Sequence, residues 1–382
     1  MNIVLIHDYL SSFGGAESVL LALHEIWPKA PIYTIFSNVR QGKDKLLDEK
    51  FKNAKIIKSW FGKLPFCEKL ISPLRFLIPL IWRSFDFSDY DLVISSASWA
   101  ITKGFSTQKI KEICYCHTPP RYLYGYETSR DWQKNKLVRL YALVVNHFMR
   151  MYDFRQAQKV TWFVANSKEV QSRIKKFYRR DSVVINPPVE IPIGLLKLIK
   201  PTDFFLTGGR LEAPKNFDLV IKACNRLKLP LKIYGTGSQE QYLRSIAGPT
   251  IEFLGFVGDE KKQELLSQTK AFIAAARDED FGITPVEAMA AGRPVIAFRG
   301  GGYLESVVGG KTGEFFPTSP PADGGAGLRG TSSPTVENLI KILRQFKSEK
   351  YKKENCIAQA KKFSKERFKR EIKKFVKKQW RT

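Results

Sequence analysis

The sequence has few acidic residues and few cysteines for its length. Against 63 lysines and arginines it has 37 aspartates and glutamates, so its formal net charge at pH 7 is +26. The five cysteines are scattered along the chain, and the spacing of Cys114 and Cys116 along an expected strand suits neither a disulfide framework nor a zinc site. This cysteine usage predicts a protein of the reducing cytosol.

Hydrophobic runs that could enter or cross a membrane are also missing. No apolar stretch reaches about 18 residues, so no transmembrane helix is expected. The N-terminal segment lacks the basic region of a secretory signal and turns polar at His7, as a first buried strand would. We therefore expect a cytoplasmic protein, either free or bound peripherally to the inner face of the cell membrane.

Several sequence motifs of known chemistry are absent as well. The sequence contains no Ser-His-Asp order, no Walker sequence and no HExxH. It also lacks the finger spacing, the aromatic-glycine pattern and the helix-turn-helix that accompany nucleic-acid binding. Asp89-Tyr90-Asp91 has the D-x-D spacing of metal-dependent transferases. Because Asp91 begins an expected strand instead of ending one, we interpret this segment as a turn and expect no metal.

The large net positive charge suggests an anionic binding partner. The charge is concentrated near the C-terminus, where residues 345–382 contain many more lysines and arginines than glutamates. Polybasic surfaces attract anionic lipid, so an anionic membrane surface is the favoured partner and no nucleic acid is expected. A merely soluble, well-charged surface is the other interpretation.

The alternation of short apolar runs with helical patterns predicts an α/β fold with parallel sheets. At 382 residues the chain exceeds one typical core and is predicted to form two domains. A helix is expected over about residues 18–26. Strands are expected at 3–6, 32–36, 91–96, 113–116, 160–165, 183–185, 204–207, 231–234, 251–254, 271–275 and 295–298.

Composition suggests where the domains meet. Residues 186–192 carry three prolines and are interpreted as a linker. The predicted domains are therefore 1–188 and 193–360, followed by a basic C-terminal helix at 361–382. Residues 318–334 are rich in glycine, proline and serine, which predicts a mobile surface loop.

One further segment has an unusual composition. Residues 55–87 interleave aromatic and basic side chains. This mixture suits a membrane interface, and it equally suits an ordinary helix that packs its aromatics inward.

The most informative segment is residues 277–294, in which Glu279 and Glu287 lie eight positions apart. Thr284 is a good N-cap and Pro285 suits the first helical position, so Glu287 would complete a capping box. The free N–H groups of that first helical turn point where a phosphate could bind. An anion site flanked by two carboxylates suits a ligand that carries both phosphate and hydroxyl groups.

Two other loops also follow expected strands and precede expected helices. Arg210 and Lys215 lie five positions apart on one of them and can converge on a diphosphate. Gly14 and Gly15 follow the first strand, where they allow the backbone to approach a phosphate closely. Each loop lies at the carboxyl end of its strand, which is where α/β sheets bind ligands.

Histidine is rare, and His117 is the candidate with a functional position. It ends an expected strand and is followed by two prolines, so it is well placed to line a ligand site. His7, His24 and His147 fall in ordinary strand or helix patterns and are predicted to be structural. Asp8, next to His7, could line an acceptor site.

The segment around Glu279 and Glu287 resembles the E-x7-E signature of retaining nucleotide-sugar glycosyltransferases of family 4. The loop of Arg210 and Lys215 is similar to the same family. The resemblance implies the GT-B fold, in which two Rossmann-like domains face a central cleft. The sequence CHTPPRYL around His117 resembles that of the mannosyltransferase-like branch, which acts in bacterial surface polysaccharide assembly.

The resemblance also implies residue roles. Glu279 would contact the donor sugar, Glu287 the ribose, and Arg210 and Lys215 the leaving diphosphate, while His117 would contact the sugar from the N-terminal domain. The implied catalytic residues are His117, Glu279, Arg210 and Lys215. The implied donor-binding residues are Gly14, Gly15, Arg210, Lys215, Val257, Phe281, Gly282, Ile283, Thr284 and Glu287. The last helix would cross back onto the N-terminal domain.

The implied reaction moves a sugar, with mannose favoured, from a nucleotide-diphosphate donor to a saccharide or lipid-linked saccharide. It would proceed with retention, in cell-surface polysaccharide biosynthesis such as that of lipopolysaccharide. GDP-mannose is the favoured donor, and neither a cofactor nor a metal is implied. Two alternatives stay open: a sugar-nucleotide epimerase on the same fold, and a basic nucleic-acid-binding protein.

Overall fold

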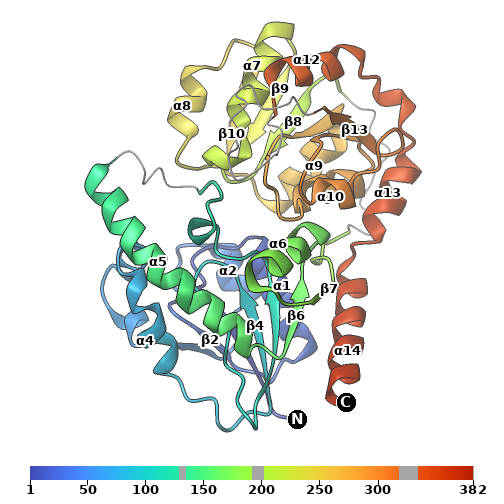
Figure 1. Ribbon diagram of the computed structural model, residues 1–382. Coiled ribbons are helices and arrows are strands. Elements are labelled where there is room, and N and C mark those ends of the chain that lie inside the picture. The colour runs from blue at the N-terminus through green and yellow to red at the C-terminus, as the bar shows by residue number, and fades with distance from the viewer. Residues whose placement is uncertain (129–134, 192–201, 318–333, 382) are drawn as a thin grey trace. The chain divides into compact units, whose positions relative to one another are not determined.

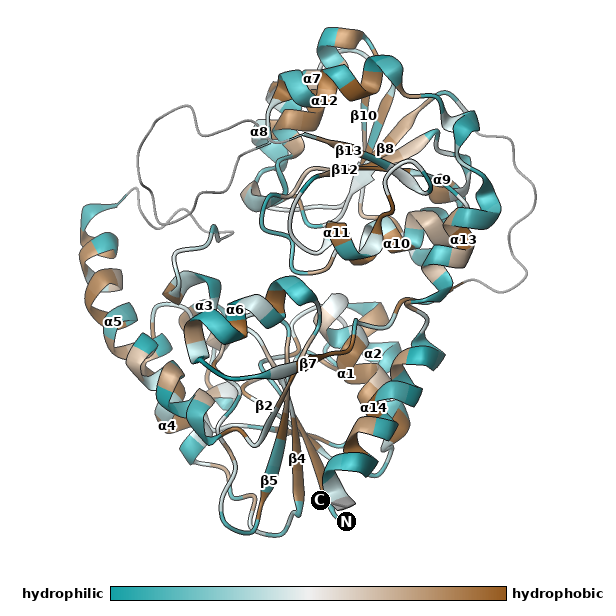
Figure 2. Ribbon diagram, turned by 45° about the vertical axis from the view of Figure 1, so that its right-hand side comes forward, coloured by the Kyte–Doolittle hydropathy of each residue, from teal (hydrophilic) through white to brown (hydrophobic). Residues whose placement is uncertain are grey.

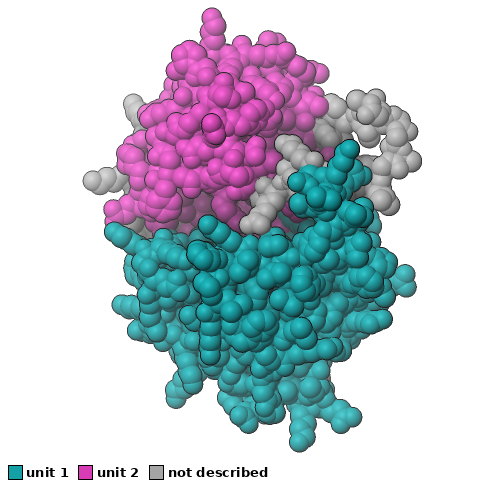
Figure 3. Space-filling model, turned by 90° about the vertical axis from the view of Figure 1, so that its left-hand side faces the viewer, with its two compact units in different colours: residues 1–126, 130–188, 365–382 teal, residues 127–129, 189–364 magenta. Residues whose placement is uncertain are grey.

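The computed structural model describes residues 1–128, 135–191, 202–317 and 334–381. The chain forms two compact units, each built on its own parallel sheet (Figures 1 and 3). Unit 1 comprises residues 1–126, 130–188 and 365–382, and unit 2 comprises residues 127–129 and 189–364. Most of the predicted loop at 318–334 and the last residue of the predicted linker lie outside the described residues.

Unit 1 has a seven-stranded sheet in the order β3-β2-β1-β4-β5-β6-β7. Its strands are β1 (Ile3–His7), β2 (Ile32–Thr34), β3 (Ile56–Lys58), β4 (Leu92–Ala97), β5 (Lys111–Cys116), β6 (Trp162–Ala165) and β7 (Ser182–Val184). Its helices are α1 (Gly15–Ile26), α2 (Lys45–Lys50), α3 (Cys67–Leu70), α4 (Ile78–Arg83), α5 (Lys136–Lys159), α6 (Lys168–Tyr178) and α14 (Lys365–Arg381).

The central strand of unit 1 shows how the sheet is covered on both faces. Along β1, Leu5 packs into a core cluster shared with α1 and α14, whereas Val4 and Ile6 pack into a second cluster shared with α4. Successive side chains of a strand point to opposite faces, so a continuous apolar strand of this kind has to be buried on both. This explains why β1 has no polar residue before His7.

Unit 2 has a six-stranded sheet in the order β10-β9-β8-β11-β12-β13. Its strands are β8 (Phe205–Gly208), β9 (Leu231–Tyr234), β10 (Ile251–Gly255), β11 (Ala271–Ala274), β12 (Val295–Phe298) and β13 (Gly313–Phe316). Its helices are α7 (Phe217–Leu227), α8 (Glu240–Ser245), α9 (Asp259–Gln268), α10 (Ile283–Ala290), α11 (Tyr303–Ser306), α12 (Val336–Gln345) and α13 (Lys353–Lys361).

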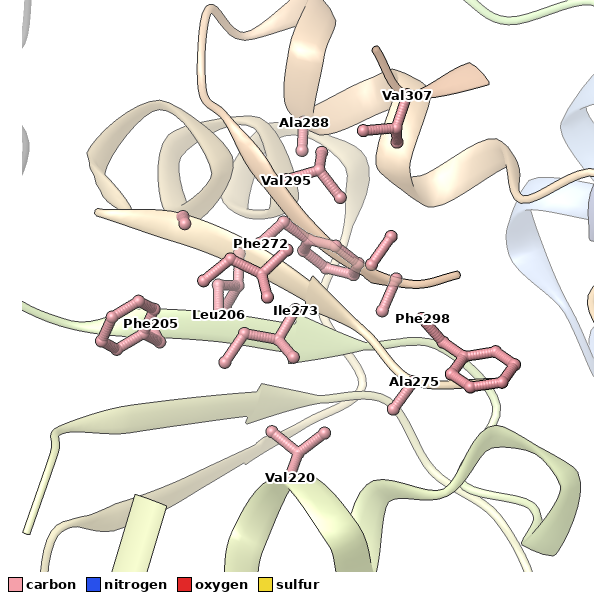
Figure 4. Packing of buried hydrophobic residues seen from close by; sticks show 14 of the residues in the cluster. Phe205, Leu206, Val220, Phe272, Ile273, Ala275, Ala288, Val295, Phe298 and Val307 are labelled. Atoms are coloured by element: carbon pink, nitrogen blue, oxygen red, sulfur yellow. The ribbon is translucent and has the colours of Figure 1, made fainter. Parts of the chain in front are cut away.

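The core of unit 2 lies on both sides of β8 and β11. Figure 4 shows Phe272 and Ile273 of β11 at its centre, with Val220 of α7 on one side of the sheet and Ala288 of α10 on the other. Both strands are buried along their length because helices cover both faces. Their ends are therefore fixed, and the loops that follow them are held in place.

The structure confirms the predicted strands, although several boundaries move by one or two residues. Two strands had no prediction: β3, a three-residue edge strand, and β13, which begins at a glycine. The predicted helix at 18–26 begins earlier, at Gly15, because the Ser18 N–H and hydroxyl both donate to the Gly14 carbonyl and close the first turn. The D-x-D segment is a turn, as predicted, in which the Tyr90 N–H donates to the Phe87 carbonyl.

The aromatic side chains of the segment at 55–87 are partly buried and partly exposed, so each of the two interpretations fits some of them. Phe61, Trp82 and Phe87 are buried, and the Trp82 indole N–H donates to the Ala100 carbonyl at 2.9 Å, as an inward-packing segment requires. Other aromatics of this segment, among them Phe66, are exposed. Within the described ranges the five cysteines are all free thiols, and no helix is both long enough and apolar enough to cross a membrane.

Unit 1 buries a glutamate, Glu112, in a pocket that suits its neutral form. The carboxyl group accepts hydrogen bonds from the Ser95 hydroxyl at 2.7 Å and from the N–H groups of Gly104 and Phe105 at 2.9 and 2.8 Å. Burial disfavours the carboxylate and raises the pKa of Glu112 to about 6, although these hydrogen bonds work in the other direction.

We expect Glu112 to make the stability of unit 1 depend on pH. Because its pKa is higher in the folded state, the stabilisation is complete below pH 4.5 and is lost as the pH rises through about 6. In Glu112→Gln, which keeps the size and hydrogen bonds of the neutral acid, this loss should disappear, a difference of about 2 kcal/mol. Urea unfolding of both proteins at pH 4.5 and pH 7 measures it, and parallel pH dependences would contradict the expectation.

The fluorescence of tryptophan is a suitable signal for that measurement. All seven tryptophans of the sequence fall in the residue ranges of unit 1, and residues 189–364 contain none. The fluorescence change on unfolding therefore reports on unit 1, even if the two units unfold separately.

Candidate active site

The strand order of unit 2 points to a ligand site beside β8 and β11. Chain order reverses between these two strands, since β9 and β10 lie on one side and β12 and β13 on the other. At such a switch point the loops after the two strands diverge to opposite faces and leave a crevice at the carboxyl edge of the sheet. Arg210 and Lys215 follow β8, and Glu279 follows β11, so the predicted residues of this unit lie around its switch point.

The loop after β8 is held by its neighbours. It ends in a short 3-10 helix (Ala213–Lys215), followed by Asn216 in the left-handed conformation with φ of 54°. The Asn216 side-chain amide donates to the Ala275 carbonyl at 3.0 Å, which ties this loop to the one after β11. A side chain at Gly235 would approach the Gly209 carbonyl to 1.8 Å, so only glycine allows the loop after β9 to pack here.

These constraints bring Lys215 and Glu279 together. The Lys215 ammonium lies 2.5 Å from the Glu279 carboxylate, and the Tyr303 hydroxyl donates to the same carboxylate at 3.3 Å. The Glu279 side chain is only 14% exposed, whereas that of Lys215 is 40% exposed. Arg210, on the same loop as Lys215, is exposed. Two cations and an oriented carboxylate therefore share this edge of the sheet.

The start of α10 differs from the prediction. The capping box of Thr284 and Glu287 is wrong: α10 begins at Ile283, its N-cap is Gly282, and no side chain caps it. The reason is the left-handed conformation of Gly282, with φ of 86°, which turns the chain into the helix two residues earlier. A Cβ at that position would approach the Tyr303 ring to 2.6 Å, so the close contact also requires glycine.

Glu287 therefore does not cap α10, and its side chain faces α9. Its carboxylate accepts a hydrogen bond from the Lys262 ammonium at 3.0 Å. Burial lowers the pKa of Lys262, but the charge of Glu287 more than offsets this, so the Lys262 pKa lies above its ordinary value. Val257, half-buried in the loop after β10, lies just before α9.

At the start of α10, the predicted residues offer backbone N–H groups to a ligand more than they offer side chains. Phe281 is buried and its ring packs against Phe363, with 5.3 Å between the ring centroids. Gly282 has no side chain, and Ile283 and Thr284 are half-buried. The N–H groups of this first turn are the groups that an anion could reach.

The loop after β12, which no prediction included, also contributes to this site. A Cβ at Gly302 would approach the Phe281 Cα to 2.3 Å, and the Gly302 N–H donates to the Glu279 carbonyl at 2.9 Å. This close backbone contact brings Tyr303 to the Glu279 carboxylate. A run of three glycines directly after an apolar strand, residues 300–302, was the sequence signal.

Unit 1 has a switch point of its own, between β1 and β4. Gly14 and Gly15, both exposed, stand at the start of α1 after β1, with Gly14 in an extended conformation. The N–H groups of the first turn have no side-chain cap. His117 follows β5 and is buried, with its ring 5.2 Å from that of Tyr115.

A series of polar contacts connects His117, directly after β5, with Glu17 in α1. His117 Nε2 lies 2.8 Å from the Ser96 hydroxyl oxygen, which lies 3.0 Å from His7 Nδ1. His7 Nε2 in turn lies 3.6 Å from the Glu17 carboxylate. If His7 carries its proton on Nε2, toward Glu17, its Nδ1 accepts from the Ser96 hydroxyl, and the Ser96 oxygen accepts from His117 Nε2–H. Ser96 thus connects His7 to His117, a contact that the sequence pattern did not indicate.

Asp8 holds a neighbouring loop of unit 1 in place. Its buried carboxylate accepts from the Trp99 and Ala100 N–H groups at 2.6 and 3.1 Å, and also from the Thr102 hydroxyl. These bonds hold the loop after β4. Among the residues that the structure describes, no three of histidine, cysteine, aspartate and glutamate are grouped so that they could hold a metal ion.

Comparison with known sequences identifies the C-terminal region. Residues 196–363 match the family model described as "Glycosyl transferases group 1". The chain is 29% identical over 279 residues to the alpha-1,3/1,6-mannosyltransferase ALG2 of Dictyostelium discoideum, a match that covers 60% of this chain and 64% of that protein. It is 24% identical to ALG2 of Candida glabrata over 375 residues, covering 81% and 78%.

A second kind of relative is the GtfA subunit of the UDP-N-acetylglucosamine–peptide N-acetylglucosaminyltransferase of Streptococcus pneumoniae. The chain is 23% identical to it over 282 residues, which is 70% of this chain and 50% of that protein. The chain thus spans less than two thirds of the Dictyostelium protein and half of the streptococcal one.

Solved structures show the same fold over nearly the whole chain. The crystal structure of Anabaena HepE in complex with UDP and glucose matches with a TM-score of 0.71 at 17% identity, covering 99% of this chain and 100% of that one. Sucrose-phosphate synthase from Thermosynechococcus elongatus matches with a TM-score of 0.70 at 15% identity, covering 100% and 99%. The chain has the two-domain α/β architecture named GT-B, and its residues 196–363 are similar to the group 1 glycosyl transferases.

Proposed function

We propose that the protein transfers a sugar, with retention, from a nucleotide-diphosphate donor to a saccharide or lipid-linked saccharide in cell-surface polysaccharide biosynthesis. The observation that carries the proposal is the arrangement of Arg210, Lys215 and Glu279 at the switch point of unit 2. The two cations would bind the donor diphosphate and stabilise the charge that develops on it as the sugar leaves. The N–H groups at the start of α10 would add to this stabilisation.

The carboxylates would bind hydroxyl groups. Glu279, oriented by Lys215 and Tyr303, would accept hydrogen bonds from the sugar, and Glu287, held by Lys262, would accept from the ribose. Because Glu279 is already paired with a cation, it is poorly suited to attack the sugar as a nucleophile. We propose a same-face route in which a departing phosphate oxygen takes the acceptor proton. A glycosyl-enzyme adduct trapped during turnover and detected by mass spectrometry would contradict this route.

Mannose, and hence GDP-mannose, is the favoured donor. Support comes from two relatives that are named as mannosyltransferases and from the sequence CHTPPRYL around His117. The GtfA relative is instead named for a UDP-N-acetylglucosamine reaction. Titration calorimetry with GDP-mannose, UDP-glucose and UDP-N-acetylglucosamine separates these possibilities.

We expect one nucleotide class to bind in the micromolar range, and Arg210→Ala to weaken that binding at least about tenfold, because a charge-assisted contact to phosphate is lost. Arg226→Ala is the matched control, since Arg226 is an exposed arginine of the same unit that pairs with Glu337 on the surface. Absence of binding to every donor, together with firm binding to nucleic acid, would overturn the proposed function.

A further inference from the structure

Helix α5 has an apolar side that no described part of the chain covers. Leu137, Leu140 and Phe148 are 79%, 61% and 64% exposed. The other large apolar side chains exposed on this helix are Val138, Leu143, Val144 and Met151. Water-facing helices normally carry polar residues at such positions, so this side of α5 needs an explanation.

The exposed residues form a stripe rather than a scatter. Leu137, Leu140, Val144, Phe148 and Met151 follow each other at intervals of three or four, which places them on one side of an α-helix. The opposite side is buried and includes Ala142, Met149 and Ala157. The helix thus carries its apolar stripe on the side that faces away from unit 1, while its buried side packs against the unit with both apolar and polar residues.

A neighbouring segment extends the stripe. The Tyr141 hydroxyl donates to the Pro73 carbonyl, and Arg75 Nε donates to the Asn146 side chain at 2.9 Å, so residues 73–75 lie against α5. Directly after them, Phe76 and Leu80 are 46% and 54% exposed. Figure 2 shows hydrophobic residues along α5 and the adjoining α4. We call this set, the exposed apolar residues of α5 with Phe76 and Leu80, the α5 face.

The exposed charges on α5 itself are all of one sign. The exposed charged residues of the helix are Lys136, Arg139, Arg150, Arg155 and Lys159. Its single acidic residue, Asp153, is fully buried and paired with Lys103. Apolar residues flanked by lysine and arginine, with no carboxylate between them, suit the interface of a bilayer. There, negatively charged headgroups lie over an apolar interior.

We propose that the α5 face is the surface by which this protein lies on a bilayer that contains anionic phospholipid. The apolar stripe enters the interface, and the flanking cations contact lipid phosphates. A second copy of the chain fits the face less well, because two such faces would bring their cations together. The inference concerns unit 1 alone and does not depend on the donor proposed for unit 2.

Sedimentation of the full chain with lipid vesicles tests the proposal. We expect binding to vesicles of phosphatidylcholine mixed with phosphatidylglycerol, little binding to phosphatidylcholine alone, and weaker binding as salt increases. Leu140→Ser combined with Phe148→Ser should lower the partition coefficient at least about tenfold. Arg139→Gln and Arg150→Gln should each lower it about fivefold. Val183→Ser, an exposed apolar position on β7 of the same unit, is the matched control and should change it little.

Hydrogen exchange of the unaltered protein provides a second measurement that requires no variant to fold. Peptides covering residues 136–151 should exchange more slowly when anionic vesicles are added. Vesicle-induced protection of the basic helix α14 without protection of α5 would overturn the proposal. It would equally fail if the α5 variants bound vesicles as the unaltered protein does, or if they only converted a dimer into a monomer.

Discussion

Lys215→Ala is expected to lower the turnover of the bound nucleotide sugar by about 100- to 1,000-fold, while the melting temperature stays nearly unchanged. The reason is that, under the proposed function, the Lys215 ammonium would bind the leaving diphosphate as it gains charge. The Lys215 side chain is 40% exposed and forms an ion pair with Glu279, and ion pairs of such exposed side chains add little to stability. Release of nucleoside diphosphate, with and without acceptor, measures the effect at the donor site itself.

Lys222→Ala is the matched control for Lys215→Ala. Lys222 has similar exposure and also pairs with a carboxylate, Asp218, but it lies on the outer surface of α7. It should leave both turnover and melting temperature unchanged. Turnover of Lys215→Ala within twofold of the unaltered protein would remove Lys215 from the diphosphate site. A loss shared equally with Lys222→Ala would point to a general effect of positive charge.

The second large effect concerns stability. Asp153→Asn should destabilise unit 1 by about 3–5 kcal/mol, because it leaves the Lys103 ammonium buried without its counter-charge. Both side chains are almost fully inaccessible, and the second carboxylate oxygen of Asp153 accepts from the Tyr124 hydroxyl at 2.8 Å. Burial lowers the pKa of Lys103, but Asp153 more than offsets this, so the ammonium stays charged in the folded protein.

Urea unfolding followed by tryptophan fluorescence measures this loss in unit 1. Lys103→Met combined with Asp153→Asn removes the buried charge as well and should recover a large part of the stability lost in Asp153→Asn alone. If the double variant were instead less stable than Asp153→Asn, the cost would come from lost packing or hydrogen bonds, and the charge argument would fail.

Local sequence patterns were enough to predict most strands of both sheets and two of the loops of the candidate site. The strands at 231–234 and 295–298 match the structure residue for residue, because short, mostly apolar runs between polar or glycine-rich loops have few alternatives in an α/β domain. The loops of Lys215 and Glu279 could be placed near each other for a related reason. Both follow strands, and the carboxyl ends of parallel strands meet at one edge.

What could not be predicted depends on contacts between distant residues. The capping box at Thr284 satisfied every local rule, yet a close contact between Gly282 and Tyr303, far along the chain, set the start of α10. Similarly, no pattern around His7 shows that Ser96 stands between it and His117, because β1, β4 and β5 supply one residue each. Spacing along the chain reveals which residues share an element, and it says little about which side chains touch across elements.

The return of α14 to unit 1 has a consequence for how the chain is made. Phe368, Ile372 and Val376 of α14 complete the cluster that contains Leu5 and Leu20, and Lys365 pairs with Glu25 of α1 at 2.6 Å. During synthesis from the N-terminus, unit 2 is therefore complete before unit 1 receives its last helix. Unit 1 is therefore begun before unit 2 and completed after it, and until α14 has been made it exposes the apolar surface to which α14 binds.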